Sequence, residues 1–183
     1  MKTLTLAFLC AVCALTVSAQ PSNLAEVQKE TEEIDKNIET ESIGSTKIKS
    51  LEFKYDKFDE ETTITANDLT DVLTLCRVKR NKQGKLRYSI IFTSDPAAKS
   101  TSTPPNWKDI DSAKVIADDK RFSLTGGMQL RYLLLFSTTE KVYEDLFLAK
   151  VIDIKIGTKE YTIDPQMIKS CATVQRLAKS LKD

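Results

Sequence analysis

Much of the chain alternates apolar and polar side chains with a period of two, the pattern of strands that bury one face. Residues 51–56, 86–92 and 128–136 show this alternation most clearly, and residues 72–78 form a further candidate strand. The turn sequence Asn81-Lys82-Gln83-Gly84 lies between two of these segments and predicts a β-hairpin.

The second half of the chain continues in the same way. Gly126-Gly127 predicts a second hairpin, joining residues 122–124 to the strand that follows. The apolar positions of residues 146–156 share one parity and predict a single long strand. That strand turns at Gly157-Thr158 into a short one over residues 161–163.

Two segments have a helical period instead. Residues 24–43 carry seven acidic side chains, two lysines and a narrow apolar stripe, which predicts a helix that lies on a surface. Asn23 and Glu26 have the spacing of a capping box at its start. Residues 165–181 have a wider apolar face, and Asp164 precedes them as the expected N-cap.

These elements predict a mainly β fold: an antiparallel meander of about eight strands, with a leading acidic helix and a C-terminal amphipathic helix. Such a meander can close into a barrel, which leaves no open strand edges, or stack as a sandwich. We expect residues 20–46 to be the helical leader and residues 47–183 to form a single β-rich domain.

The first 19 residues have the features of a secretory signal peptide. Lys2 precedes an uncharged, mostly apolar run from Leu4 to Val17, and Ser18-Ala19 suits the cleavage site. The run is shorter than the roughly 20 residues that span a bilayer. The sequence therefore predicts a secreted, extracellular protein with no membrane span.

Composition restricts the chemistry. The 183 residues include no histidine, which excludes a Ser-His-Asp triad, a Cys-His dyad and histidine metal sites. With 27 basic and 26 acidic residues, net charge gives no reason to expect nucleic acid. We expect a protein that is not an enzyme and has no catalytic residue, metal or cofactor. A carboxylate pair for glycoside hydrolysis is the open enzymatic alternative.

Cleavage of the leader would leave two cysteines, Cys76 and Cys171. In an oxidising compartment such a pair most often closes on itself, so we expect a disulfide between a strand and the last helix. Pairing with another chain, or two free thiols, are the alternatives.

The layout resembles that of a lipocalin: a secreted chain of this size, a short leading helix, meandering strands, a late helix and a bridge to the C-terminal region. The Gly-x-Trp signature of that family is missing, since Ser45-Thr46 follow Gly44 and the one tryptophan is Trp107. The resemblance implies a barrel that carries a small apolar ligand. The same alternating side chains could equally be a packed core. The candidate lining residues are Tyr88, Phe92, Leu130, Tyr132, Leu134 and Phe136.

A basic run supports a different function. Residues 77–87 contain six cations and no acid, and a Pro-rich loop follows over residues 94–106. We expect Lys79, Arg80, Lys82 and Lys85 to bind a partner if the protein is an extracellular interaction module or inhibitor. A polyanion site, a solvated turn that protects an edge strand, and a dibasic cleavage site are the other interpretations. A large apolar cavity would favour the carrier, and a filled interior the interaction module.

Overall fold

The computed structural model describes residues 21–38, 42–43, 46–47, 49–69, 71–93, 110–130 and 133–182. The expected signal peptide, the Pro-rich loop and Tyr132 lie outside these ranges. Of Leu130 only the backbone is described.

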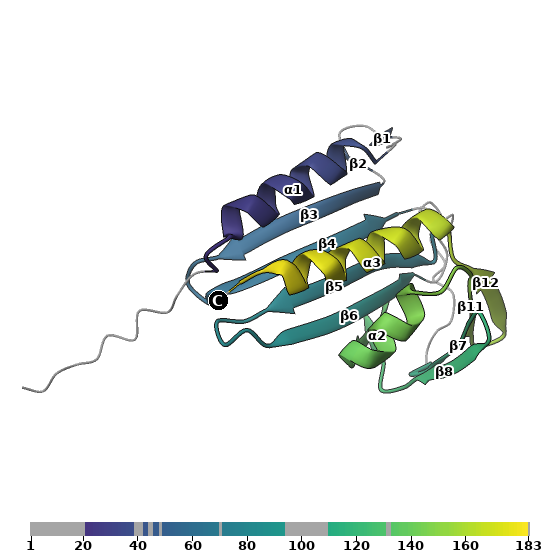
Figure 1. The fold of residues 1–183 in the computed structure, drawn as a ribbon. Helices are drawn as coiled ribbons and strands as arrows, with labels where there is room; N and C mark the ends of the chain where they lie inside the picture. The colour runs from purple at the N-terminus through teal and green to yellow at the C-terminus, as the bar shows by residue number, and fades with distance from the viewer. Residues whose placement is uncertain are drawn as a thin grey trace, which may run out of the picture.

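Most strands belong to one six-stranded antiparallel sheet, in the order β3-β4-β5-β6-β10-β9 (Figure 1). The turn after Asn81 joins β5 to β6 as predicted: the Asn81 side chain accepts hydrogen bonds from the amides of Gln83 and Lys85, and Gly84 has a φ of 76°. The strands are β3 (Lys49–Asp56), β4 (Glu61–Asp68), β5 (Leu73–Arg80), β6 (Leu86–Thr93), β9 (Met128–Leu130) and β10 (Leu133–Thr138).

The other strands form two smaller antiparallel sheets. In the four-stranded sheet, ordered β12-β11-β7-β8, the strands are β7 (Ala113–Ala117), β8 (Lys120–Leu124), β11 (Ile152–Ile156) and β12 (Lys159–Thr162). A short hairpin pairs β1 (Ser42–Ile43) with β2 (Thr46–Lys47). The mainly β, antiparallel prediction is confirmed. Within the described ranges no sheet closes into a barrel, while a sandwich-like layout is compatible with the strand order.

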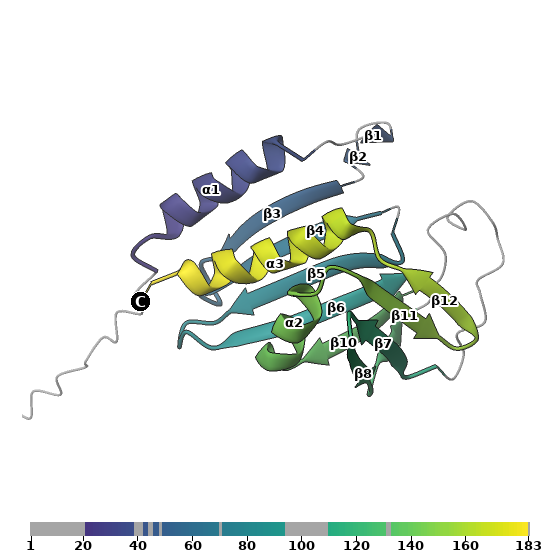
Figure 2. The ribbon, with the colours of Figure 1, turned by 45° about the vertical axis from the view of Figure 1, so that its right-hand side comes forward.

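The helices α1 (Leu24–Lys36), α2 (Glu140–Phe147) and α3 (Pro165–Ser180) lie on the same side of the six-stranded sheet (Figures 1 and 2). The first covers β3, α3 covers β4 and β5, and α2 contacts β6 and α3. A disulfide joins Cys76 of β5 to Cys171 of α3, with Cα atoms 5.6 Å apart, and fixes the helix to the sheet.

Both predicted helices form, with differences at the first. Asp164 caps α3 as expected, since its side chain accepts a hydrogen bond from the Gln166 amide. By contrast, α1 ends at Lys36 rather than near residue 43. The side chain of Asn23 makes no capping hydrogen bond. It bonds instead to the backbone of Ser180 and Lys182, tying the start of α1 to the end of α3.

Three predicted β elements are wrong. Residues 128–136 form two strands rather than one, because β9 and β10 pair with each other and place Met128 opposite Leu135. Residues 146–156 are not one strand, because Leu146 and Phe147 end α2 and β11 begins only at Ile152. The parity of the apolar positions masked a helical spacing in Tyr143, Leu146 and Phe147, all three of which are buried.

Gly126-Gly127 is not a hairpin turn. The strand β8 pairs with β7, whereas β9 pairs with β10, so the two glycines connect different sheets. Gly127 has a packing reason to lack a side chain: a Cβ there would lie 2.7 Å from the Phe136 ring.

Candidate interaction surface

Four of the six residues predicted to line a ligand cavity are described with their side chains, and these four lie in the packed core. Tyr88, Phe92, Leu134 and Phe136 are each at most 3 % exposed and belong to β6 and β10. The rings of Phe92 and Phe136 pack edge to face with centroids 5.9 Å apart. They therefore fill the side of the sheet that the helices cover.

Little space is left around them. In the void bounded by β5, β6, α2 and the four-stranded sheet, the centre of a water molecule could occupy about 10 Å³, which is about the minimum that a cavity needs to hold one water. The described core therefore has no room for a small ligand between these elements. The void's lining residues are Leu73, Ile90, Phe92, Val115, Leu124, Leu146, Phe147, Ile152 and Ile154.

The opposite side of the six-stranded sheet, here called the open face, is different. Successive side chains of a strand point to opposite sides, so each strand contributes to both faces. The buried residues Ile64, Val78 and Ile90 belong to the covered face. All three described helices lie on that side, and none of them packs on the open face.

Basic side chains from neighbouring strands form one end of the open face. Strand register places Lys79 opposite Arg87 on one side and Thr63 on the other, with Lys54 opposite Thr63. Arg77 lies two residues from Lys79 along β5, on the same face. Its Nε atom is buried with no hydrogen-bond partner among the described atoms. We call this set, Lys54, Arg77, Lys79 and Arg87, the basic end.

The acidic residues on the same face are engaged within the fold. Glu61 forms an ion pair with Lys79 at 2.5 Å, and the Glu52 carboxylate accepts hydrogen bonds from Ser50 and Asn67. The Asp56 carboxylate accepts hydrogen bonds from the backbone amides of Phe58 and Asp59, and these bonds hold the pKa of Asp56 below its ordinary value. Among the described residues, none forms an ion pair with Lys54, Arg77 or Arg87.

The four predicted partner-binding residues separate in the structure. Lys79 belongs to the basic end, and Lys82 and Lys85 extend it at the turn between β5 and β6. Arg80 lies on the covered face and is 8 % exposed. Adjacent residues of a strand face opposite ways, so Lys79 and Arg80 cannot both contact one partner on the open face.

An apolar row crosses the open face beyond the basic end. Leu75, Ile91, Leu135 and Met128 are direct cross-strand neighbours in β5, β6, β10 and β9. Met128 is 55 % exposed, and the other three are partly exposed. Sequence reasoning missed this row. Its signal was the break in alternation at Ile90-Ile91-Phe92 and Leu133-Leu134-Leu135, where both faces of a strand are apolar.

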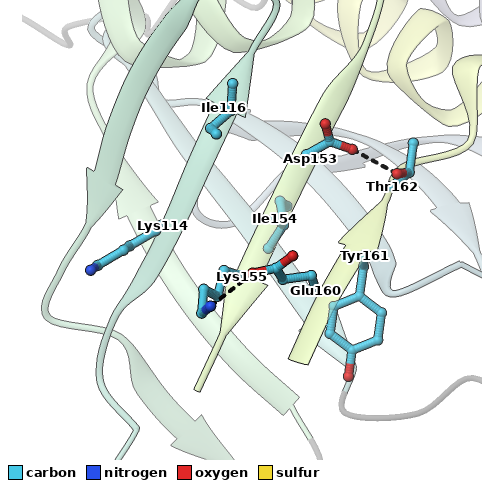
Figure 3. A pocket seen from close by; sticks show the side chains of 8 residues that line it. All are labelled: Lys114, Ile116, Asp153, Ile154, Lys155, Glu160, Tyr161 and Thr162. Carbon is cyan, nitrogen blue, oxygen red and sulfur yellow. Dashed lines mark hydrogen bonds and ion pairs between the residues drawn. The ribbon is translucent and has the colours of Figure 1, made fainter. Parts of the chain in front are cut away.

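The four-stranded sheet carries a half-open hollow of about 470 Å³ on its outer side (Figure 3). Three of its four charged residues have partners within the sheet. Lys155 pairs with Glu160 at 2.7 Å, and Asp153 accepts a hydrogen bond from Thr162 at 2.6 Å. Because Lys114 is the one charged lining residue outside these contacts, this hollow has less to offer a charged ligand than the open face.

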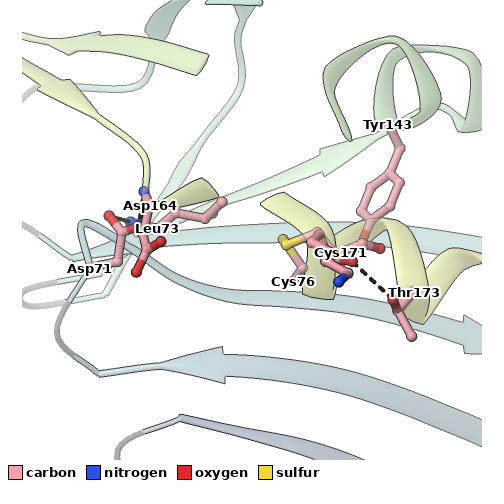
Figure 4. Close-up of a disulfide and its surroundings, with 8 residues drawn as sticks. Asp71, Leu73, Cys76, Tyr143, Asp164, Cys171 and Thr173 are labelled. Atoms are coloured by element: carbon pink, nitrogen blue, oxygen red, sulfur yellow. Dashed lines mark hydrogen bonds between the residues drawn. A yellow bond between two sulfur atoms is a disulfide. The ribbon is translucent and has the colours of Figure 1, made fainter. Parts of the chain in front are cut away.

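Acidic residues also gather near the disulfide, at the start of α3 (Figure 4). Burial raises the pKa of Asp71, which accepts a hydrogen bond from the Asp164 amide. Lys49 bridges Asp68 and Asp164, at 3.1 and 2.7 Å, and lowers the pKa of Asp164. Among the described residues no group of His, Cys, Asp or Glu has the arrangement to hold a metal ion. We interpret this cluster as structural.

Comparison with protein families, curated proteins and solved structures finds no match to this chain. The likeness to lipocalins therefore stays a resemblance of layout. None of the described helices is long and apolar enough to cross a bilayer.

Proposed function

We propose that this protein is a secreted, non-enzymatic binding module that engages an acidic partner protein through its open face. The observation that carries the proposal is the basic end, where Lys54, Arg77 and Arg87 have no ion-pair partner among the described residues. Lys82 and Lys85 add charge at the adjacent turn. Clustered cations of this kind steer an acidic partner and fix its orientation.

The packed core supports this function over transport of a small apolar ligand. A carrier needs a cavity of a few hundred Å³, and the residues that would line one are instead packed against each other. An extracellular setting agrees with the Cys76–Cys171 disulfide, because such bonds persist in oxidising compartments.

The test is selection of random peptides displayed on phage against the folded protein. We expect the selected peptides to be rich in Asp and Glu. The double variant Arg77→Glu/Arg87→Glu should weaken their binding by about tenfold or more, and added salt should weaken binding to the wild type. Lys114→Glu, on the outer side of the four-stranded sheet, is the matched control and should leave binding unchanged.

Peptides that bind the charge-reversal variant as well as the wild type would contradict the proposal. A fluorescent fatty acid that binds the protein saturably, with an affinity that Phe136→Ala changes, would favour the carrier instead.

A further inference from the structure

We infer that the partner contributes an extended segment whose acidic and aliphatic side chains alternate in register with the open face. This inference rests on the proposed function and adds the chemistry and spacing of the ligand. The evidence for it is the order in which rows of cross-strand neighbours follow one another along the strands of the open face. A basic row comes first, then a polar row, then the apolar row.

The row order follows from residues two apart on each strand. In β5 the open face presents Lys79, Arg77 and Leu75 in turn, and in β6 it presents Arg87, Ser89 and Ile91. The basic row and the apolar row are four positions apart along each strand, which is about 13 Å at the rise of an antiparallel strand.

An extended segment has the same repeat. Its side chains at positions i, i+2 and i+4 point to one side, over the same distance of about 13 Å. A segment packed along the strands, as in aligned sheet packing, would place an acid at i over Lys79 and Arg87. A second acid at i+2 would reach Arg77, and an aliphatic residue at i+4 would cover Ile91.

The apolar row favours a protein segment over a sulfated polysaccharide. A sulfate group gains nothing from contact with the apolar row, whereas aliphatic side chains of a protein segment would remove the row from water. The row consists of Leu75, Ile91, Leu135 and Met128. Because four neighbouring strands contribute to the row, it is broad enough for more than one residue of the partner.

The experiment compares two synthetic peptides of identical composition by NMR titration of the intact protein. The in-register peptide is acetyl-Thr-Glu-Thr-Glu-Thr-Leu-Thr-amide, with both acids and the leucine on one side. In the shifted peptide, acetyl-Thr-Glu-Thr-Glu-Leu-Thr-Thr-amide, the leucine points to the other side. We expect the in-register peptide to bind about tenfold more tightly.

Two variants test the role of the apolar row. Ile91→Thr keeps a β-branched residue in the strand, and Met128→Ser changes a side chain that is already 55 % exposed. Each should reduce the preference for the in-register peptide while leaving the thermal unfolding midpoint nearly unchanged. Arg77→Glu/Arg87→Glu should weaken both peptides.

The outcomes separate the two proposals. Equal binding of the two peptides, with both weakened by charge reversal, would overturn the inference and leave the proposed function standing. Peptide binding that charge reversal does not affect would overturn both. If neither peptide binds while a heparin fragment does, with no effect of Ile91→Thr, the ligand is a polyanion and both proposals are wrong.

Discussion

At the scale of single residues, the side to which each side chain points decides its role. Lys79 and Arg80 are neighbours in sequence and have the same charge, yet Lys79 lies on the open face, paired with Glu61, and Arg80 is buried on the covered face. Ile90 and Ile91 divide in the same way between core and surface. Composition alone could not separate these pairs, because only strand register assigns the two faces.

A first prediction concerns Asp164, which caps α3 and binds Lys49. Asp164→Ala should lower the free energy of unfolding by about 1 kcal/mol through the lost cap. Asp164→Asn keeps an acceptor for the Gln166 amide but loses the ion pair. Urea unfolding at neutral pH should therefore rank the wild type above the Asn variant, and the Asn variant above the Ala variant.

The free energy of unfolding of the same variants should also depend on pH, in a direction set by the pKa of Asp164. The pKa of Asp164 is lowered in the folded protein, so its stabilising effect is present above the ordinary pKa and fades as pH falls through the lowered value. The Asn variant should lose less stability than the wild type between neutral pH and about pH 3. An equal loss in both proteins would show that the Lys49 pair contributes nothing.

At the scale of elements, the helices are fastened to the sheet and to each other by long-range contacts. Glu30 of α1 pairs with Arg176 of α3 at 2.8 Å, and Lys179 of α3 binds both Glu140 and Glu144 of α2. The acidic first helix therefore contacts the basic side of the last helix. They meet because α1 and α3 lie side by side on the sheet.

A second prediction concerns the disulfide. Replacing both Cys76 and Cys171 with Ser should reduce the free energy of unfolding by about 2–5 kcal/mol, since the bond closes a loop of 95 positions. Denaturant unfolding of the wild type and the double variant measures the difference. Mass spectrometry of unreduced peptides should find the two cysteines joined, and two free thiols in protein purified without a reductant would contradict the assignment.

The elements that the sequence predicted are those whose signals are local. The β5–β6 hairpin has strict alternation and an Asn-x-x-Gly turn, and α3 has a cap and a full apolar face. The pattern did not single out β4, whose inward positions Thr62, Ile64 and Ala66 include a polar and a small residue. In α2, too few residues were available for its helical period to show against a strand-like parity.

At the scale of the whole molecule, the described core is filled with packed apolar side chains, and the basic end and the apolar row lie on the opposite side of the six-stranded sheet. Two substitutions in the same sheet should therefore lower the free energy of unfolding by very different amounts. Phe136→Ala, on the covered face, should lower the free energy of unfolding by roughly 3–5 kcal/mol. Ile91→Thr, on the open face, should cost less than about 1 kcal/mol. Comparable losses in thermal or denaturant unfolding would mean that the open face is packed as a core is.

The candidate surface was only half visible in the sequence. The cationic run between Arg77 and Arg87 is contiguous and could be found by counting charges. The apolar row left only the breaks in alternation in β6 and β10 as a signal, because its four residues come from four strands and become neighbours only when β10 pairs with β6. Long-range strand order is not encoded in any local pattern.

The central claim is that the open face is the binding surface, and chemical-shift mapping tests it most directly. The isotope-labelled protein is titrated with the in-register acidic peptide, and the perturbed backbone amides are placed on the structure. We predict perturbations concentrated in β5, β6 and β10 at the basic end and the apolar row, which Arg77→Glu/Arg87→Glu should remove. Perturbations confined to the four-stranded sheet, or spread through the core residues around Phe92 and Phe136, would contradict the claim.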